Sequence, residues 1–247
     1  MNEIDVLAIF AHPDDVELTV GGTLLKMKSR GYKTGALDVT RGEMGTRGTV
    51  AGRAKEAEEA ANILKLDVRE NLGLPDGHVF ATDDEFRAKL VRVLRRLKPK
   101  VLLTHQIDDP HPDHHHIAQL VRESARLASM QKYDGDFGQE RTNAPIVAHN
   151  IFSQRVTPSF IVDISDFLVE KTASIKAHVS QFYNPNAGKD ELETRLTSKG
   201  FIDELENRSR YFGSLIGVAA GEPFFVREAL NVEDPIELLT RPMNLYS

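Results

Sequence analysis

Cysteine is absent from this 247-residue chain. Disulfide bonds, thiolate nucleophiles and cysteine-based zinc sites are therefore all excluded. A metal site in this chain would have to use histidine and carboxylate ligands.

An excess of basic residues is also missing, because 37 Asp and Glu outnumber 31 Lys and Arg and give a formal net charge of -6. Nucleic acid and anionic membranes are therefore not expected as partners. The apolar run in the N-terminal segment MNEIDVLAIF is far too short to span a bilayer and lacks the basic, cleavable flanks of a secretory signal. We predict a cytoplasmic protein without a membrane partner.

What remains is the composition of an ordinary globular protein, 40% hydrophobic and 28% charged. The length suits one core, and we predict a single domain over residues 1–247. Apolar runs indicating buried strands alternate with helical patterns: strands at 4–10, 33–40, 68–74 and 101–104, and helices at 15–29, 51–66 and 83–97. This alternation predicts an α/β protein with a Rossmann-like three-layer fold and a largely parallel sheet.

Local signals refine this outline. Gly31 is expected to stop the first helix, and Thr82 with Glu85 forms a capping-box pattern before the helix at 83–97. Segments 146–152 and 160–164 are expected to be further strands, and 166–182 and 201–214 further helices. The tail after about residue 232 is left unassigned.

A first cluster of polar residues, Ala11-His12-Pro13-Asp14-Asp15-Val16-Glu17, directly follows the first strand. Ligand sites in parallel sheets form at the carboxyl ends of strands. His12 and Asp15 can turn toward one point, because Pro13 stiffens the loop between them. Two alternatives stay open: Asp14 or Asp15 caps the next helix, and Glu17 serves only the helix dipole.

A second cluster, His111-Pro112-Asp113-His114-His115-His116, follows the strand and histidine VLLTH. Imidazole and carboxylate together suit zinc and similar metals, whereas calcium and magnesium call for oxygen ligands. A run of histidines is often a solvated helix start, so we discount His115 and His116. Two histidines with one carboxylate leave a position open for water, which is typical of catalytic zinc.

The two motifs AHPDDVE and HPDH together resemble the LmbE/PIG-L superfamily of zinc-dependent N-acetylglucosaminyl deacetylases. The similarity covers about residues 4–231. Its closest branch is that of the bacillithiol-pathway N-acetylglucosaminyl-malate deacetylases, which four further segments resemble: TRGEMGTRG (40–48), NLGLPDG (71–77), SQFYNPN (180–186) and FGSLIGV (212–218).

By this resemblance, His12, Asp15 and His114 hold one zinc ion per chain. The same ligands would also accept Fe²⁺ or Co²⁺. The resemblance further implies a homo-oligomer, with a hexamer as the family's assembly, and a small amino-sugar substrate. The function it implies is removal of the acetyl group from N-acetylglucosaminyl-L-malate in bacillithiol biosynthesis.

The catalytic roles come from the same resemblance. Asp14 is expected to be the general base, and a protonated His111 to assist the oxyanion or the leaving group. Asp113 is expected to orient an imidazole, with a helix N-cap before 114–130 as the equal alternative. The lead-in Asp108-Asp109-Pro110 is unusually acidic for the family and leaves the substrate detail open.

Substrate contacts are expected from three residues. Arg53 and Arg47 would bind the malate carboxylates, since a planar guanidinium matches a carboxylate. Asp76 would accept sugar hydroxyls. The alternatives are that Arg53 is a surface charge on an exposed helix, and that Asp76 belongs to a Pro-Asp-Gly turn.

Three other functions compete with this prediction. A dinucleotide-binding oxidoreductase would need G-x-G-x-x-G after the first strand, where this chain has HPDDVELTVGG. A non-catalytic metal-binding or sugar-binding module would keep the ligands but would not need Asp14. An amidase of glucosaminyl-thiol conjugates would share the whole metal chemistry.

Overall fold

The computed structural model describes residues 3–152, 156–184 and 192–240. Within them, seven strands form one sheet in the order β3-β2-β1-β4-β5-β7-β6. The strands from β3 to β5 are parallel, and β7 is antiparallel to both of its neighbours. The strands are β1 (Val6–Phe10), β2 (Thr34–Thr40), β3 (Val68–Leu74), β4 (Val101–Thr104), β5 (Ile146–Asn150), β6 (Phe160–Asp163) and β7 (Gly221–Phe225).

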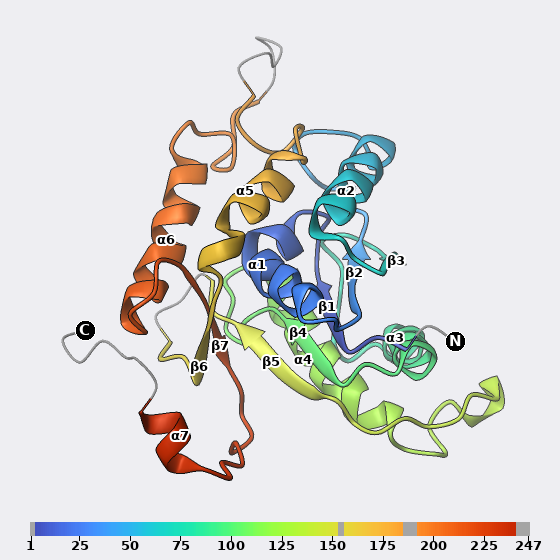
Figure 1. Cartoon of the computed structure of the whole chain (residues 1–247). Coiled ribbons are helices and arrows are strands. Elements are labelled where there is room, and N and C mark those ends of the chain that lie inside the picture. Colours follow the sequence, from blue (N-terminus) through green and yellow to red (C-terminus); the bar gives the residue numbers. More distant parts are fainter. Residues whose placement is uncertain (1–2, 153–155, 185–191, 241–247) are drawn as a thin grey trace.

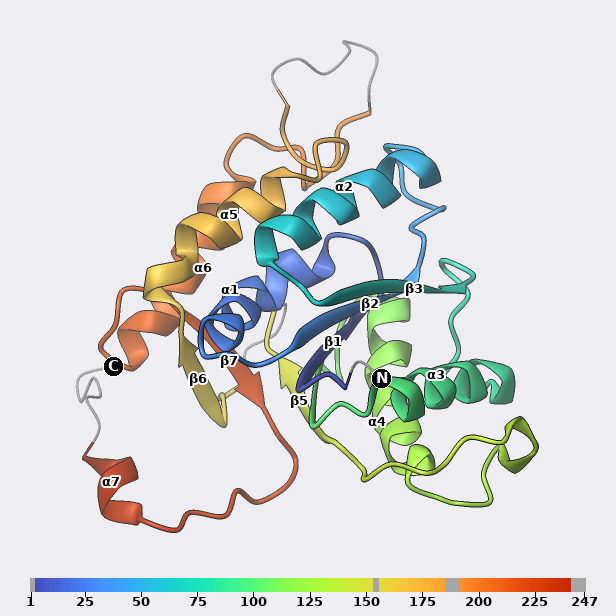
Figure 2. The same ribbon diagram turned by 45° about the vertical axis from the view of Figure 1, so that its right-hand side comes forward.

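Helices cover both faces of this sheet, which confirms the predicted α/β three-layer fold. Figures 1 and 2 show α1, α2, α5 and α6 on one side and α3 and α4 on the other. The helices are α1 (Asp15–Ser29), α2 (Val50–Leu64), α3 (Asp84–Leu97), α4 (Pro112–Ala128), α5 (Leu168–Lys176), α6 (Phe201–Leu215) and α7 (Pro235–Leu239). Two short 3₁₀ turns lie at Gly135–Phe137 and Ser165–Phe167.

The central strand β1 explains why the sheet forms as expected. All five of its residues are buried, as its continuous apolar run predicts for a strand covered on both faces. Leu7 and Ile9 pack with α3 and α4, whereas Ala8 and Phe10 pack with α1. Two apolar cores therefore hold the helical layers to opposite faces of one sheet.

Several boundaries differ from the sequence prediction. The capping box at Thr82 is wrong, because Asp83 is the N-cap of α3 and its carboxylate accepts from the backbone N–H groups of Glu85 and Phe86. The helix predicted over 166–182 ends at Lys176. Strand β7 was not predicted, since its sequence GEPFF begins with residues that rarely occupy a strand centre.

The C-terminal tail contains α7, which stands apart from the sheet in Figures 1 and 2. Residues 1–2 and 241–247 of the predicted domain lie outside the described residues, as do residues 185–186 of the motif SQFYNPN. No helix among the described residues is both long and apolar enough to cross a lipid bilayer.

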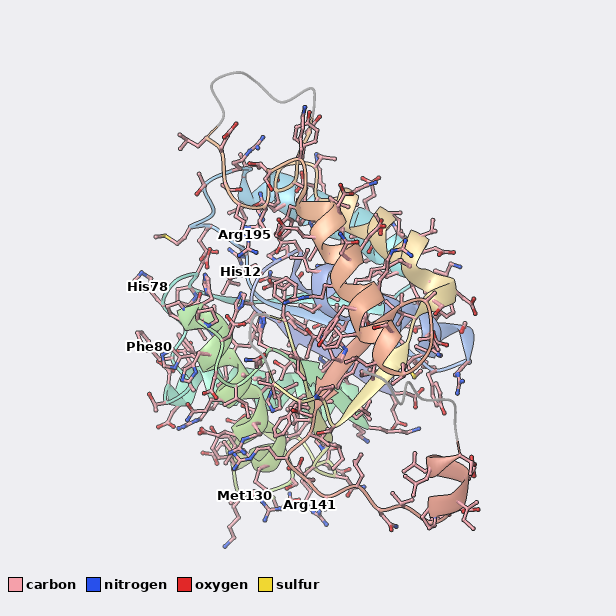
Figure 3. All side chains as sticks on the ribbon, turned by 90° about the vertical axis from the view of Figure 1, so that its left-hand side faces the viewer. His12, His78, Phe80, Met130, Arg141 and Arg195 are labelled. Carbon is pink, nitrogen blue, oxygen red and sulfur yellow. The ribbon has the colours of Figure 1, made fainter. Side chains whose placement is uncertain are left out.

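The strand order reverses between β1 and β4. From β1 the chain builds outward through β2 and β3, and it then returns to place β4 on the other side of β1. The carboxyl ends of β1 and β4 diverge into separate loops at this point, where open α/β sheets bind their ligands. The first of these loops carries the cluster at 11–17, and the second leads to the cluster at 111–116. Figure 3 shows His12 of the first loop lying inward of His78 and Phe80, two exposed residues at the edge of the molecule.

Candidate metal centre

The loop after β1 turns its polar side chains toward one point. The Asp15 Oδ2 atom accepts a hydrogen bond from the backbone N–H of His12 at 2.8 Å and lies 3.2 Å from His12 Nδ1. Asp14 occupies the N-cap position of α1, but its side chain caps no backbone group. Its φ of 143° is one that residues with a side chain rarely adopt, and such strain gathers at functional sites. Helix capping therefore explains neither aspartate.

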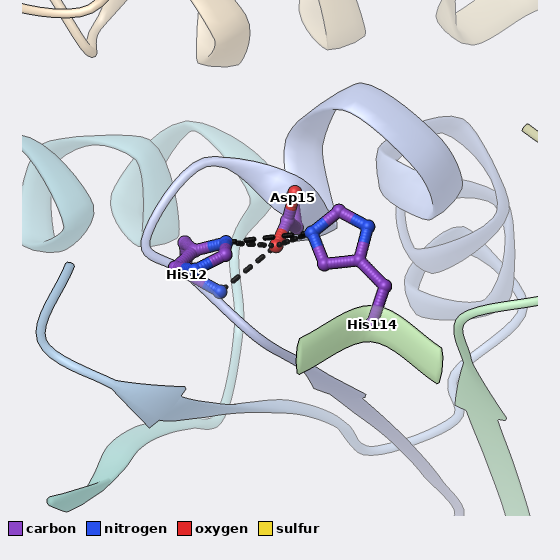
Figure 4. Close-up of side chains that lie close together, drawn as sticks. All are labelled: His12, Asp15 and His114. Carbon is purple, nitrogen blue, oxygen red and sulfur yellow. Dashed lines mark hydrogen bonds and ion pairs between the residues drawn. The ribbon is translucent and has the colours of Figure 1, made fainter. Parts of the chain in front are cut away.

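The start of α4 brings His114 to the same point (Figure 4). His114 Nε2 lies 3.5 Å from Asp15 Oδ2 and 3.4 Å from His12 Nδ1. Three donor atoms thus lie 3.2–3.5 Å from one another. Ligand atoms around a tetrahedral zinc ion at about 2.0–2.1 Å are separated by about 3.3 Å. The spacing fits one small divalent ion that these three side chains would hold.

Carboxylates on the far side of each imidazole set the direction of its lone pair. His12 Nε2 lies 3.0 Å from Asp76 Oδ1, and His114 Nδ1 lies 3.2 Å from Asp109 Oδ1. Each outer nitrogen can therefore carry the ring proton and donate a hydrogen bond to a carboxylate, which leaves the lone pair of the inner nitrogen available to bind a cation. Metal-binding histidines are normally oriented in this way.

The electrostatics of the site favour a cation. Burial opposes a charged His12, but its contacts with Asp15 and Asp76 raise its pKa to about 10. Burial likewise opposes ionisation of Asp15, yet the nearby His114 and His12 hold the pKa of Asp15 well below its ordinary value. The carboxylates that raise the His12 pKa also give the site a negative potential that attracts a cation, and a metal ion that binds there must displace the proton on the inner nitrogen of His12.

Asp14 lies beside these ligands and is buried. Burial raises its pKa to about 6, against the lowering effect of Arg53. The Arg53 side chain is itself buried and donates to Asp14 Oδ2 at 3.3 Å, to the Pro13 carbonyl at 2.9 Å and to the Gly42 carbonyl at 3.0 Å. A Cβ at Gly42 would lie 1.9 Å from Arg53 Nη1. A side chain on residue 42 would therefore displace the Arg53 guanidinium from this position.

Two comparisons with known proteins bear on this site. The family model of PIG-L, described as GlcNAc-PI de-N-acetylase, matches residues 7–125 and so includes both clusters. The diacetylchitobiose deacetylase of Thermococcus kodakarensis is 32% identical over 194 residues, covering 72% of this chain and 70% of that protein. This chain belongs to the PIG-L/LmbE family.

A further relative and a solved structure extend the comparison. A probable N-acetyl-alpha-D-glucosaminyl L-malate deacetylase 2 of Bacillus anthracis is 28% identical over 73% of this chain and 83% of its own length. The crystal structure of the conserved protein TT1542 from Thermus thermophilus superposes with a TM-score of 0.81 at 35% identity, covering 93% of this chain and 97% of that one. The fold thus agrees with that solved structure over 93% of this chain, and the two named relatives cover 72–73% of it.

His111 and Asp113, both from the second cluster of polar residues, lie beside the centre. The His111 ring centre lies 5.1 Å from that of His12 and 4.4 Å from that of His114. Burial and the neighbouring His114 lower the His111 pKa, so the free protein favours a neutral imidazole there. A neutral imidazole still has one N–H to donate.

Asp113 is almost fully buried and is not the N-cap of α4, which is His111. The Asp113 carboxylate accepts from the backbone N–H groups of Gly77 and Val79, and it lies 4.0 Å from His12 Nε2. Its described contacts therefore tie α4 to the turn that carries Asp76. That it also orients a catalytic imidazole stays a prediction.

Of the three predicted substrate residues, Asp76 and Arg53 contact residues of the centre. Asp76 is buried, and its two oxygens contact His12 Nε2 and the backbone N–H of Met44. Arg47 lies on the loop between β2 and α2, and its carbonyl accepts from Gln181 Nε2. Arg53 contacts Asp14, as described above. Substrate binding by these three residues stays a prediction.

Two residues of the centre were missed by the sequence analysis. Asp109 was noted only as an unusual acid, yet its carboxylate orients His114 and also accepts from the backbone N–H of His111. His105 directly follows β4, accepts from the Ala11 N–H at 2.8 Å and stacks on His114 at 3.9 Å. Its position at a strand end was the available signal, the same signal that selected His12.

Replacing Asp109 with asparagine should weaken metal binding about 10- to 100-fold, the usual effect of removing such an orienting carboxylate. The neutral amide can no longer stabilise the His114 orientation as a charged acceptor. Competition with a chelator of known zinc affinity measures the change, and Asp108→Asn is the matched control on the exposed neighbouring residue. Equal affinity of wild type and Asp109→Asn would remove Asp109 from this role.

Proposed function

We propose that this chain is a zinc-dependent N-deacetylase that removes the acetyl group from a small molecule containing N-acetylglucosamine. The observation that carries the proposal is the convergence of His12, Asp15 and His114 on one point, with the strained Asp14 beside them. The two relatives described above, a diacetylchitobiose deacetylase and a probable N-acetylglucosaminyl malate deacetylase, are named for the deacetylation of such compounds.

The overall reaction adds water to an amide and yields acetate and a free amine. A zinc ion held by the three ligands would supply an activated water at neutral pH and would polarise the acetyl carbonyl. Asp14 directly precedes the ligand Asp15 and is proposed to accept the proton of the attacking water, and a pKa raised by burial to about 6 suits a general base that works near neutral pH. Arg53 keeps the Asp14 carboxylate in place for this step.

His111 acts on the other side of the acetyl group. The His111 ring stands next to both metal-binding imidazoles and keeps substantial exposure to solvent. One N–H from this ring can stabilise the negative charge that develops on the carbonyl oxygen. The proton taken up by Asp14 is then available for the departing amine.

For the substrate we propose N-acetylglucosaminyl-L-malate, in a pathway to a bacillithiol-type thiol. The support is the set of shared motifs and the malate deacetylase relative. Diacetylchitobiose is the second candidate, supported by the relative with 32% identity. An amidase acting on glucosaminyl-thiol conjugates would use the same residues. A cytoplasmic location and a homo-oligomer, a hexamer in the family's manner, stay predictions.

Hydrolysis of four compounds tests the proposal. Acetate release is measured for N-acetylglucosamine, N-acetylglucosaminyl-L-malate and diacetylchitobiose. For a thiol conjugate of glucosaminyl-malate, cleavage of the conjugate's own amide is measured. We expect the highest kcat/KM for the malate compound. A preference for diacetylchitobiose would change the proposed substrate but not the proposed deacetylase activity. Cleavage of the conjugate alone would mean that the protein is an amidase. If the zinc-loaded protein hydrolysed none of the four compounds, the proposal would be contradicted, and the alternative of a non-catalytic metal-binding or sugar-binding module would be favoured.

Replacing Arg53 with alanine separates two roles of this residue. Its contacts with Asp14 and two carbonyls lead us to expect a similar loss of kcat/KM, about 10- to 150-fold, on every acetylated sugar, since a charge-assisted hydrogen bond contributes about 1.5–3 kcal/mol. Steady-state kinetics on N-acetylglucosamine and its malate derivative measure this. A loss confined to the malate compound would instead support the sequence prediction that Arg53 binds malate, and no loss on either would exclude both roles.

A further inference from the structure

The turn after α5, residues 178–182, contacts three separate parts of the metal centre's surroundings. The elements it touches all come far earlier in the chain, and its SQF segment belongs to a family motif to which the proposed function gives no task. His178 is fully buried and its Nε2 lies 3.2 Å from Glu17 Oε2, on the helix that begins with Asp15. Two further contacts lead to α2 and to the loop before it.

Ser180 binds α2. Its backbone N–H donates to Glu56 Oε1 at 2.9 Å, and its hydroxyl donates to Glu56 Oε2 at 2.8 Å. Glu56 is a buried residue one turn after Arg53. The turn is thereby fixed against the helix that positions the partner of Asp14.

Gln181 binds the loop of residues 41–48. Its Nε2 donates to the carbonyl of Arg47 at 2.8 Å, and the side chain is buried. The fit is close at the next residue, because a Cβ on Gly48 would lie 2.6 Å from Ser180 Oγ and 3.1 Å from Gln181 Nε2. Gly48 has a φ of +78°, which also favours glycine. The C-terminal half of the loop is thus seated on the turn.

The N-terminal half of the same loop is seated on the metal centre. The Gly42 carbonyl accepts from Arg53, and the Met44 N–H donates to Asp76, which contacts His12. The outer side of this half is open, with the Met44 side chain 68% exposed. The loop therefore stands beside the centre, with one end held by site residues and the other held by Gln181.

We propose that Gln181 is a positioning residue that sets the 41–48 loop as the wall for the part of the substrate beyond the acetylated sugar. This inference rests on the proposed function, because it assigns the loop a place in that substrate site. The loop carries Arg47. The position in which Gln181 holds the loop would therefore decide where the Arg47 guanidinium can contact an anionic or hydroxylated group attached to the sugar. Gln181 acts on specificity through the loop and touches no reacting atom.

The variants Gln181→Ala and Gln181→Glu test this inference. Alanine removes the hydrogen bond to the Arg47 carbonyl, and glutamate sets a carboxylate against that carbonyl, so its effect should be the larger. We expect KM for N-acetylglucosaminyl-L-malate or diacetylchitobiose, whichever is the better substrate, to rise about 5- to 10-fold, with kcat changed less than KM. The selectivity for that compound over N-acetylglucosamine should fall by the same factor, at equal zinc content.

A matched control is Gln139→Glu, because Gln139 Nε2 also donates to an arginine carbonyl, that of Arg92, far from the centre. Hydrogen exchange of the 41–48 amides gives a readout that needs no substrate. We expect faster exchange there in Gln181→Glu and wild-type exchange in Gln139→Glu. Unchanged exchange at 41–48, or an equal rise of KM for N-acetylglucosamine, would overturn the inference. If wild type cleaves no acetylated sugar, the proposed function fails while the exchange experiment still decides whether Gln181 seats the loop.

Discussion

Replacing Asp14 with asparagine should lower kcat by at least ~100-fold and leave zinc bound, because general-base catalysis contributes on that scale. Asparagine keeps the shape of the side chain and its contact with Arg53, but it cannot accept the proton of the attacking water. Steady-state kinetics on the best acetylated sugar, with elemental analysis of the same samples, measure both quantities.

Two results would contradict this role of Asp14. Near-normal turnover in Asp14→Asn would show that another group accepts the proton. Loss of zinc together with activity would make Asp14 a ligand. Asp15→Asn is the comparison variant, and it should lose zinc because Asp15 supplies one of the three donor atoms.

Replacing Arg69 with alanine should cost about 3–5 kcal/mol of unfolding free energy, the largest stability effect we expect from one side chain. Arg69 Nη1 donates to Glu17 Oε1 at 2.6 Å, while Nε and Nη2 donate to the two oxygens of Asp38. Both acids are almost fully buried. Without Arg69 they would be left as buried carboxylates with no arginine between them.

Arg96→Ala is the matched control for the Arg69 variant. Arg96 also donates through two nitrogens to one carboxylate, that of Glu70, but its side chain is 48% exposed. Exposed pairs contribute about 1 kcal/mol or less. Urea unfolding should therefore separate the two variants by at least about 2 kcal/mol. Equal losses would mean that burial does not decide the strength of the Arg69 cluster.

The sequence predicted those parts of the molecule that depend on local pattern. Strand β1 is a continuous apolar run buried on both faces, and the residues after it stand at a strand end, so His12 and Asp15 could be selected from the amino-acid order alone. The same logic applied to β4 led to His114. Long, regular elements and strand-end ligands are encoded over a few neighbouring residues.

Pairing between distant residues could not be predicted in this way. Glu17 could be read as an acid that serves the helix dipole, but it is fully buried between Arg69 and His178, which come much later in the chain. Asp109 and Asp113 are two acids of one short segment, and only the fold shows that Asp109 faces His114.

Arg53 shows a further limit, because an Ala-rich and Glu-rich helix gives little sign of which face is inside. The Arg53 side chain is buried since Gly42 leaves room for it, and no pattern within α2 reveals that space. Strand β7 is a similar case. Its Glu222 is buried where it accepts from Lys171 Nζ and from the backbone N–H groups of Gly22 and Thr23. Glu222 can be recognised as a core residue only in the folded protein, where β7, α1 and α5 meet.

The most direct test of the account removes the metal and returns it. Protein stripped by a chelator should release no acetate from the best acetylated sugar, and activity should return in proportion to added zinc up to about one equivalent per chain. His114→Ala should neither bind that equivalent nor regain activity. Full acetate release by stripped wild-type protein, or by His114→Ala, would contradict a deacetylase built on His12, Asp15 and His114.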